Sequence, residues 1–563
     1  MILRPDGSPS RPVIAAIGMV STLLAAAVAQ TTHPAGRPNV VLIITDDQGY
    51  GDLSIHGNPH LATPTLDRIA REGVRFTQFH VSPVCSPTRA SLMTGRYNFR
   101  TGAIDTYIGR SMMRPDEVTL AELLADAGYQ TGIFGKWHLG DNYPMRAMDQ
   151  GFAEALVFRG GGLAQPSDEP DGTYFDPYLY HNGRPTRGRG YCTDVFTDAA
   201  LAFIERNRHG PFFVYLATNA PHDPLQVPED YVRPFTDVGV EPDTARVYGM
   251  IVNIDRNAGR LLEALARWHL ADNTILIFLT DNGPAGRPRF NAGMRGHKGT
   301  VYEGGIRVPF FVRWPARLRA GVTVDHIAAH IDVMPTILDA CGVPVPKDLT
   351  LDGRSLLPLM DAAGGPEQPG WPERTLFFQW HRGDVPEPFR NCAVLTSRYK
   401  LVDGKELYDL RSDPAEQRDI AADHPDVVAR LRAEYERWFR DVCAEGFDPP
   451  RIQIGTPREN PSVLTRQDWR GSKGYTDADL GWYEIRAAAG LYRITLRFPT
   501  TPAPEKAHLR IGPLTREMPV RPQITSCTFE SITIPAGDCR LEAWIDSQGR
   551  QVGPRFVEVE RVE

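Results

Sequence analysis

The sequence predicts an α/β protein: a mostly parallel sheet between helices, then a smaller C-terminal α+β subdomain, and last a β-sandwich domain. Three observations lead to this fold class. From Pro38 onward, short apolar runs alternate with amphipathic segments; Gly and Pro are frequent around residues 364–372; and from Ser462 onward the patterns are those of strands. A chain of 563 residues is also too long for one hydrophobic core, so we expect two or three domains.

The first region, residues 38–365, contains the predicted sheet. "NVVLIITDDQG" begins with a continuous apolar run, as expected of a strand that is covered on both faces. "TLAELLADAG" places Leu120, Leu123 and Leu124 on one face of a helix, and Gly128 is its stop signal. Further apolar runs, each followed by polar residues, occur in "YQTGIFGKWHLG", "PFFVYLATNAPHDP" and "NTILIFLTDNG". Strands that alternate with helices in this way form a parallel sheet whose carboxyl ends share one edge.

The remaining chain divides into three parts. Residues 366–447 contain a predicted hairpin, "RYKLVDGKELYDL", and a helix with one apolar face, which predicts a small antiparallel sheet with a docked helix. Residues 448–461 are polar and rich in proline, which predicts a linker. In residues 462–563, segments such as "LYRITLRFP" alternate apolar and polar side chains, which predicts a β-sandwich. This last domain is either a self-contained module or a lid packed on the first region.

Residues 1–29 have the features of a signal peptide. Arg4 and Arg11 precede the apolar segment "VIAAIGMVSTLLAAAVAQ", which contains Ala27-Val28-Ala29 as a small-residue cleavage site. An uncleaved membrane anchor is the alternative, because the segment is close to the length that a membrane span requires. We expect cleavage after Ala29 and an exported mature protein, periplasmic or secreted, with no stable membrane insertion.

Charge and cysteine content exclude some functions. A net charge of −7 is mild for this length and the chain has no run of Lys or Arg, which argues against a nucleic-acid binder. An exported chain with seven cysteines can hold disulfides, and Cys527 and Cys539 are close enough in sequence to bridge a hairpin. The odd number leaves at least one thiol. The sequence has no Cys-x-x-Cys pair, so we do not expect a zinc site built from thiolates.

Two segments that resemble each other predict a metal site. "LIITDDQG" and "IFLTDNG" each place two adjacent oxygen-bearing residues directly after a strand: Asp46 and Asp47 in the first, Asp281 and Asn282 in the second. Such an all-oxygen set at the carboxyl edge of a sheet suits a hard cation, calcium before magnesium. The alternative is that both segments are simply turns, because Asp and Asn favour turns.

Further strand ends carry cations and imidazoles. Lys136 and His138 in "FGKWHLG" alternate to the same side if that segment is extended, and His222 and Lys298 follow in "TNAPHDP" and "RGHKGTVYEGG". Each of these residues alone would be an ordinary polar or surface side chain. Together with Arg89 and a metal ion they would form a site for a highly charged oxyanion.

Cys85 lies where a short apolar strand gives way to a predicted helix. Ser86 is the expected N-cap and Pro87 suits the first turn, so the thiol would lie at the positive end of the helix dipole. From the residues alone, Cys85 is a thiol nucleophile, half of a disulfide, a metal ligand or a precursor for modification. The surroundings typical of papain-like cysteine nucleophiles are absent.

The stretch Cys85-Ser86-Pro87-Thr88-Arg89, with "ASLMTGR" after it, resembles the C-x-P-x-R signature of the sulfatase family. The "TDD", "GKWHLG", "PHDP", "TDNG" and "KGTVYEGG" segments also match that family, in the same order. The resemblance extends from about Pro38 to Cys443 and does not include the β-domain. It implies an alkaline-phosphatase-like α/β fold with a smaller C-terminal subdomain that carries a helix.

The resemblance also implies the chemistry of each residue. In this family a separate maturation enzyme oxidises the cysteine to formylglycine, an aldehyde whose hydrate is the nucleophile, so Cys85 would be the modified residue. Calcium would be bound by Asp46, Asp47, residue 85, Asp281 and Asn282. The hydrate would be held by Arg89 and Lys136 and deprotonated by His138, while His222 and Lys298, with Lys136, would contact the sulfate. One polar position that the family has between His138 and His222 finds no match here.

These implications give one leading function and two alternatives. The leading function is calcium-dependent hydrolysis of a sulfate ester, of the arylsulfatase type, with a sulfated carbohydrate as the natural substrate. The first alternative is a phosphodiesterase or phosphonate-ester hydrolase that uses the same site, and the second is a sugar-binding protein without activity. In the loop "FRGGGLAQPSDEPDGTYFDPYLY", the residues that would meet sugar hydroxyls, or else be surface polar side chains, are Asp168, Asp171, Tyr174 and Tyr178. Trp482 and Trp544 of the β-domain would stack on sugars or be buried core residues.

Overall fold

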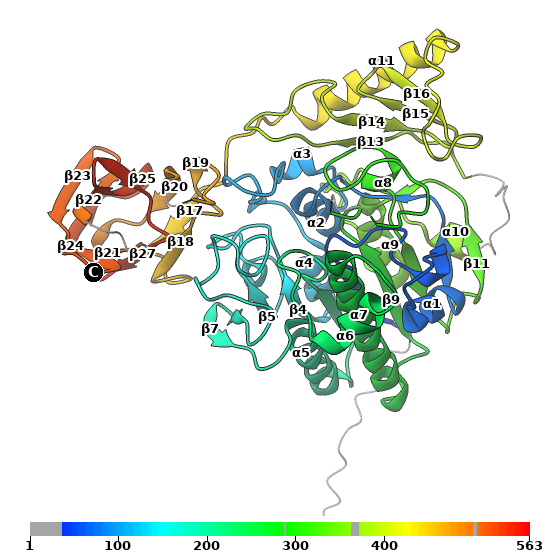
Figure 1. Cartoon of the computed structure of the whole chain (residues 1–563), viewed down its shortest axis with the longest axis horizontal. Coiled ribbons are helices and arrows are strands. Elements are labelled where there is room, and N and C mark those ends of the chain that lie inside the picture. Colours follow the sequence, from blue (N-terminus) through cyan, green and yellow to red (C-terminus); the bar gives the residue numbers. More distant parts are fainter. Residues whose placement is uncertain (1–35, 286–288, 362–370, 477, 499–503) are drawn as a thin grey trace, which may run out of the picture.

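The structure is a computed structural model that describes residues 36–285, 289–361, 371–476, 478–498 and 504–563. Three bodies follow one another along the chain: a large α/β domain, a small subdomain with one long helix, and an all-β domain at the opposite end of the molecule (Figure 1). The predicted signal peptide, residues 1–29, lies outside the described residues. Across the part of the chain that is described, none of the helices combines the length and apolarity that crossing a bilayer requires.

The α/β domain is built on one mixed sheet of ten strands. In spatial order these are β11 (Val322–Val324), β2 (Val74–Phe76), β10 (Phe310–Arg313), β9 (Thr274–Thr280), β1 (Asn39–Thr45), β8 (Phe212–Ala217), β4 (Gln130–Lys136), β5 (Glu154–Phe158), β6 (Tyr178–His181) and β7 (Arg184–Arg187). The central strands β9, β1, β8, β4 and β5 are parallel to one another, whereas β10, β6 and β7 pair antiparallel. The predicted parallel sheet is therefore confirmed for its centre.

Helices cover both faces of this sheet, as the continuous apolar strands predicted. On one face the core contains Val40 and Leu42 of β1 with side chains of α2 (Cys85–Thr94), α4 (Leu120–Asp126) and α9 (Val333–Cys341). On the other face it contains Val41 and Ile43 with α1 (Pro64–Arg71), α5 (Cys192–Asn207) and α7 (Pro242–Arg267). Because alternate residues of β1 enter two different cores, the strand has no polar face. Shorter helices are α3 (Asn98–Thr101), α6 (Glu229–Thr236), α8 (Glu303–Ile306) and α10 (Leu357–Asp361).

The small subdomain has the predicted antiparallel sheet and docked helix. The strands β13 (Leu376–Gln379), β14 (Cys392–Leu395), β15 (Tyr399–Val402) and β16 (Glu406–Asp409) form a meander, and α11 (Pro425–Val442) packs on it. Leu431, Tyr435 and Trp438 of α11 are buried in one core with Phe99 of the α/β domain. This shared core fixes the subdomain on the large domain.

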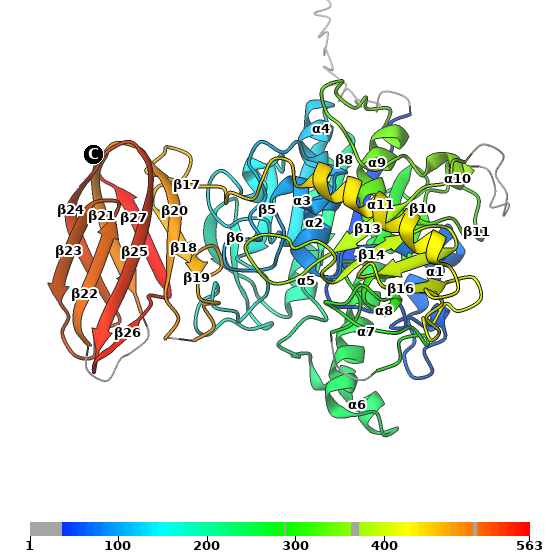
Figure 2. The ribbon, with the colours of Figure 1, turned by 90° about the horizontal axis from the view of Figure 1, so that it is seen from above.

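The C-terminal domain is a sandwich of two sheets, whose strands lie side by side in Figure 2, with one sheet in front of the other. One sheet contains β17 (Ile452–Ile454), β19 (Arg470–Gly471), β20 (Gly481–Ala487), β22 (Pro504–Ile511), β23 (Leu514–Pro519), β25 (Gly537–Ser547) and β26 (Arg550–Val552). The other contains β18 (Ser462–Thr465), β21 (Gly490–Arg497), β24 (Ser526–Ile534) and β27 (Phe556–Arg561). The predicted linker 448–461 includes β17, which pairs parallel with β20, so the sandwich begins earlier than expected. Cys527 and Cys539 are free thiols, not a disulfide.

The sandwich packs tightly on the α/β domain. Met112 and Met145 of the α/β domain are buried in the sandwich core. Polar contacts cross the same boundary: Asp468 Oδ2 accepts a hydrogen bond from the Asp141 amide at 3.1 Å, and Arg497 pairs with Glu169 at 2.7 Å. Of the two roles that the sequence left open, these contacts favour a domain docked on the first region.

Candidate active site

The carboxyl ends of neighbouring parallel strands meet at one edge of the large sheet. The register pairs Thr45 of β1 with Thr280 of β9, so Asp46 and Asp281 follow their strands at the same level. The strands β8 and β4 end beside them and lead into the loops that carry the predicted cations and imidazoles. The topology therefore brings together side chains that are more than 200 residues apart in the sequence, for example Asp47 and Asn282 with a separation of 235.

Oxygen and sulfur ligands gather at this edge. Two groups each have ligand atoms within 4.8 Å of one another. The groups are Asp46, Cys85 and Asp281, and Asp46, Asp47 and His222. Among the described residues, Asp46 Oδ1 and Asn282 Oδ1 are buried and lack a hydrogen-bond partner. Because an unsatisfied buried oxygen is costly and a cation would satisfy both, this donor set fits a hard metal ion.

Each carboxylate of the site is also paired with a basic side chain. Lys136 Nζ lies 2.5 Å from Asp46 Oδ2, Lys298 Nζ lies 2.5 Å from Asp47 Oδ1, and Arg89 Nη2 lies 2.7 Å from Asp281 Oδ2. Arg89, Lys136 and Asp46 are completely buried, while Lys298 keeps about a fifth of its side chain exposed. Lys298 is thus the one cation of these three that is partly exposed to solvent.

The electrostatics of the two acid positions differ. Burial and the neighbouring charge of Asp46 raise the pKa of Asp281 to about 6. Burial also acts on Asp47, but Lys298 and His222 outweigh it and hold the pKa of Asp47 well below its usual range. The pKa of Lys298 is raised despite its burial, chiefly by Asp47. At neutral pH the Asp47 carboxylate is therefore ionised and the Lys298 amine is protonated, so the two form an ion pair.

Cys85 and His138 face each other in this site. Cys85 Sγ lies 3.4 Å from His138 Nδ1, and both residues are buried. On the far side of the ring, His138 Nε2 lies 2.8 Å from the carbonyl oxygen of Thr106. A carbonyl only accepts, so Nε2 carries the proton and Nδ1 presents its lone pair to residue 85. Burial, followed by the charge of Lys136, lowers the pKa of His138, which keeps the ring neutral and able to accept a proton.

The local backbone differs from the sequence-based expectation in two places. The N-cap of α2 is Val84, and the Ser86 hydroxyl has no hydrogen-bond partner among the described residues, so Ser86 is the second helical residue and not the cap. β4 ends at Lys136, and His138 has a φ of 59°, so these two residues do not alternate along one extended strand. A left-handed conformation is strained for a histidine, and such strain commonly marks functional sites.

His222 completes the site from the loop after β8. Its Nε2 lies 3.8 Å from Asp47 Oδ2, and burial lowers its pKa to about 4. The sequence suggested that Tyr174 contacts a sugar, but its hydroxyl donates to the His222 carbonyl oxygen at 2.5 Å and the residue is completely buried. Tyr174 therefore supports the loop that carries His222. Trp544 stacks on His508 at 4.8 Å between ring centroids, and both alternate with core residues of their strands, so they lie on the face of the sheet that points away from the sandwich core.

The loop of residues 160–165 passes between the two imidazoles. A Cβ atom added to Gly161 would lie 2.8 Å from the His138 ring, and one added to Gly162 would lie 3.1 Å from Gln165 Nε2 and 3.4 Å from the His222 ring. Only glycine permits this approach. The Gln165 side chain lies against the same two glycines, so it is a polar side chain close to both imidazoles that the sequence did not single out; the run of three glycines before it is the signal that points to this loop.

A rim of side chains from all three bodies borders the site. The rings of Tyr107 and Tyr475 meet edge to face at 6.0 Å, and the Arg382 guanidinium lies 3.9 Å over the Tyr107 ring. Arg382 also donates to Thr106 Oγ1 at 2.7 Å, which ties the rim to the residue that orients His138. Tyr475 is 55% exposed. We call Tyr107, Arg382 and Tyr475 the aromatic rim.

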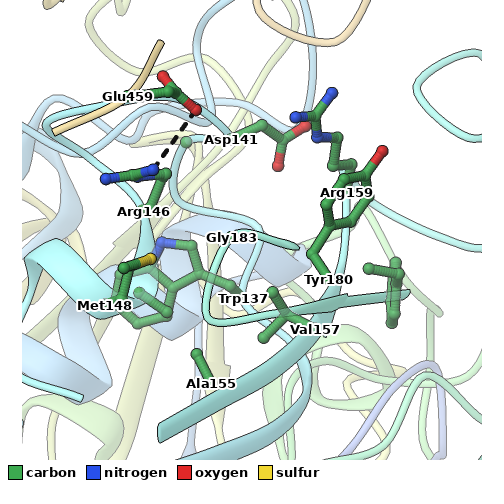
Figure 3. A pocket seen from close by; sticks show the side chains of 13 residues that line it. Trp137, Asp141, Arg146, Met148, Ala155, Val157, Arg159, Tyr180, Gly183 and Glu459 are labelled. Carbon is green, nitrogen blue, oxygen red and sulfur yellow. Dashed lines mark ion pairs between the residues drawn. The ribbon is translucent and has the colours of Figure 1, made fainter. Parts of the chain in front are cut away.

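A separate pocket lies behind the site, between β5 and the start of the sandwich (Figure 3). It has a volume of about 40 Å³. Trp137 and Val157 form its apolar side, and Arg146 and Glu459 form an ion pair across its other side. None of the predicted site residues lines it, so it belongs to the joint between the domains.

Comparisons with known proteins are consistent with this geometry. A family model described as Sulfatase matches residues 38–343, and a second, described as N-sulphoglucosamine sulphohydrolase, C-terminal, matches residues 296–440. Human arylsulfatase A is 33% identical over 429 aligned residues, which cover 67% of this chain and 78% of that protein. Human N-acetylgalactosamine-6-sulfatase is 34% identical over 353 residues, which cover 57% of this chain and 66% of that protein. A crystal structure of Ps i-CgsB in complex with k-i-k-neocarrahexaose matches with a TM-score of 0.65 and 29% identity, over 71% of this chain and 92% of that one.

Proposed function

The chain belongs to the sulfatase family, and from this premise we propose that it is an exported, calcium-dependent sulfatase that acts on sulfated carbohydrates through a formylglycine at position 85. One observation carries the proposal. The Cys85 side chain lies at the first turn of α2, opposite the free nitrogen of His138 and beside a donor set that fits a hard cation.

The environment of Cys85 suits a precursor better than a thiol catalyst. Burial raises the pKa of the Cys85 thiol, although Lys136 and Lys298 act in the opposite direction, so little thiolate is present at neutral pH. The thiol is also free of any disulfide. Conversion to formylglycine requires a separate maturation enzyme and an external oxidant, since the thiol carbon is oxidised to an aldehyde and the sulfur leaves.

Residues of this chain would then divide the work of ester cleavage. Formylglycine would supply, as its hydrate, one hydroxyl that attacks sulfur and a second whose deprotonation expels sulfate and restores the aldehyde. His138 Nδ1 would take the proton of the attacking hydroxyl; this role is supported by the contact of Nδ1 with residue 85 and by the hydrogen bond from Nε2 to the Thr106 carbonyl oxygen. Lys298 and His222 lie on the open side, where they would bind the sulfate and its leaving oxygen.

Calcium would be held by Asp46, Asp47, Asp281, Asn282 and the oxygen of residue 85. Bound there, it would neutralise the negative charge of the sulfate group that otherwise repels a nucleophile. The unsatisfied oxygens of Asp46 and Asn282 support this assignment, because all-oxygen ligand sets are those that calcium prefers. Arg89 and Lys136 pair with the carboxylates of Asp281 and Asp46, and these ion pairs would hold the proposed ligands in place before a metal binds.

The carbohydrate substrate rests on the relatives and on the aromatic rim. One relative is named for a sulfated amino sugar, and the matched crystal structure contains an oligosaccharide. Aromatic faces stack on sugar rings, and an arginine at the rim can bind a further sulfate group. The rim therefore provides a place for a second sugar unit next to the reacting ester.

Two measurements test the proposed function. Protein produced together with a maturation enzyme should show formylglycine at position 85 by peptide mass spectrometry, and should release sulfate from an aryl sulfate faster than it cleaves an aryl phosphodiester or phosphonate ester. Cys85→Ala should fold normally and lose turnover, since only the nucleophile is removed. Full activity of protein with unmodified Cys85, or a preference for the phosphorus esters, would contradict the proposal.

A further inference from the structure

The C-terminal sandwich reaches into the active site through one side chain. Gln467 follows β18, is 8% exposed, and its Nε2 lies 3.2 Å from His138 Nε2. The two residues are 329 positions apart in the sequence, and the family match ends before the sandwich begins. The contact is therefore a property of the added domain.

The hydrogen bonds of Gln467 show what this contact does. Its Nε2 donates to the Thr106 carbonyl oxygen at 2.7 Å and to Ser111 Oγ at 2.9 Å, which uses both amide hydrogens. The same Thr106 carbonyl accepts from His138 Nε2 at 2.8 Å. Gln467 thus holds in place the Thr106 carbonyl oxygen, the acceptor that determines the tautomer of His138. The Gln467 amide also packs against the edge of the His138 ring that points away from residue 85.

The backbone around Gln467 holds the same loop. The Gly109 amide donates to the Gln467 carbonyl oxygen at 3.0 Å, and Arg470 Nη1 donates to the Ile108 carbonyl oxygen at 2.6 Å. Gly109 has a φ of 66°, and a Cβ atom there would lie 2.9 Å from the Asp468 carbonyl oxygen. Only glycine allows the loop and the sandwich to approach so closely. Residues 106–111 are therefore held to residues 467–470 at several points.

We propose that Gln467 is a positioning residue for His138, so that the C-terminal sandwich completes the active site. The proposal rests on the proposed function, because the proton that His138 takes is that of the residue 85 hydrate. Without the Gln467 amide, the Thr106 carbonyl loses one of its two donors and the ring gains freedom to rotate. A rotated ring presents its N–H, and not its lone pair, to the nucleophile.

Two substitutions of similar size test this role in the full-length enzyme. Gln467→Met keeps the length of the side chain and removes both donors, and Gln467→Leu removes both donors with a branched apolar side chain of similar volume. For both variants we expect kcat on an aryl sulfate to fall roughly 10- to 100-fold, the size of a general-base contribution, with KM within about threefold of wild type. KM is spared because Lys298 and His222, which bind the sulfate, are not touched.

Glu459→Gln is the matched control for docking of the domain. Glu459 lies in the same domain joint and accepts from the Tyr143 amide at 2.9 Å and from Asn142 Nδ2 at 3.2 Å. This variant loosens the joint without touching His138, so its kcat should stay within twofold of wild type. Unchanged kcat in both Gln467 variants, or an equal loss of kcat in the control, would overturn the proposal.

A second readout does not depend on turnover. With ¹⁵N-labelled histidine, the Nε2–H proton of His138 should be protected from exchange in the wild type and in Glu459→Gln, and lose protection in Gln467→Met. If the wild type releases no sulfate, the proposed function fails and this measurement still decides whether Gln467 positions the ring. Equal protection in the wild type and in Gln467→Met would then refute the role.

Discussion

Arg89 Nη2 lies 2.7 Å from Asp281 Oδ2, and both side chains are completely buried. Arg89 Nε contacts the same oxygen at 3.2 Å, and Nη1 donates to the Lys136 carbonyl oxygen at 3.2 Å. One guanidinium therefore links the helix that begins with Cys85, the acidic end of β9 and the end of β4. The proposed nucleophile, the proposed cation site and the cationic strand end are positioned relative to one another by a single planar group.

Arg89→Lys tests this link. Lysine keeps the charge but has one donor centre and cannot reach both the Asp281 carboxylate and the Lys136 carbonyl oxygen. We therefore expect kcat to fall roughly 100-fold and the free energy of unfolding to drop by about 1–3 kcal/mol, the cost of an unsatisfied buried acceptor. Steady-state kinetics and urea unfolding measure the two effects. Arg96→Lys is the control, because Arg96 also holds a carboxylate with two bonds, to Glu117 at 2.8 and 2.9 Å, outside the site. It should lose stability and keep kcat; an equal loss of kcat there would refute the specific role of Arg89.

Removal of a metal ligand should lower calcium affinity and activity together. In Asp46→Ala and Asp281→Ala we expect at least a tenfold weaker calcium affinity by calorimetry on metal-stripped protein, and a matching fall of kcat, because the remaining oxygens satisfy the cation less well. Asp255→Ala is the control: Asp255 is buried but accepts from the Leu66 amide at 2.8 Å, beneath the other face of the sheet. Chelator-resistant, full activity in both site variants would rule out the metal site.

Substitution of Tyr475 should separate large from small substrates. If the aromatic rim binds a second sugar unit, Tyr475→Ala loses a stacking contact of about 0.5–1.5 kcal/mol, which corresponds to a rise in KM of roughly two- to tenfold for a sulfated oligosaccharide. KM for a small aryl sulfate should not change, because that substrate ends before the rim. Tyr475→Phe should behave as wild type, since it keeps the ring. An equal change with both substrates would contradict the rim as a sugar site.

Stability should decrease with falling pH because of buried neutral histidines. Burial, followed by the charge of His80, lowers the pKa of His330 to about 3, and its Nε2 contacts Ser82 Oγ at 3.0 Å. Between the ordinary pKa of about 6.5 and this value, the unfolded chain binds a proton that the folded chain does not, so each pH unit removes up to about 1.4 kcal/mol of unfolding free energy.

His330→Gln should remove this proton linkage. Urea unfolding between pH 6.5 and 4.5 should give a slope of stability against pH that is shallower than that of wild type by about one proton. His60→Gln replaces an exposed histidine and should leave the slope unchanged. The linkage to His330 is wrong if the wild type and His330→Gln lose stability in parallel.

Local sequence determined the fold class and most of the site. Continuous apolar runs such as Val40–Ile44 specify strands that are buried on both faces, and strands of this kind between helices form a parallel sheet whose ends share one edge. The acidic residues after β1 and β9 and the Cys85–Arg89 motif could be recognised for the same reason: their chemistry lies within a few residues of a strand end or a helix start.

Only the tertiary structure decided how these residues are oriented and which partners support them. The left-handed backbone of His138, the Thr106 carbonyl that sets its tautomer, and the Gln467 amide that holds that carbonyl carry no signature in the sequence. Each is an ordinary residue whose role depends on which residues lie near it in the folded protein. Gln467 and His138, for example, are in contact although 329 positions separate them in the sequence. Periodicity and motifs report local chain geometry, whereas the docking of two domains depends on side-chain packing over the whole boundary, as with Met112 and Met145 in the sandwich core. The sequence therefore predicted which groups form the candidate site, and the packing of the domains determined how these groups are held.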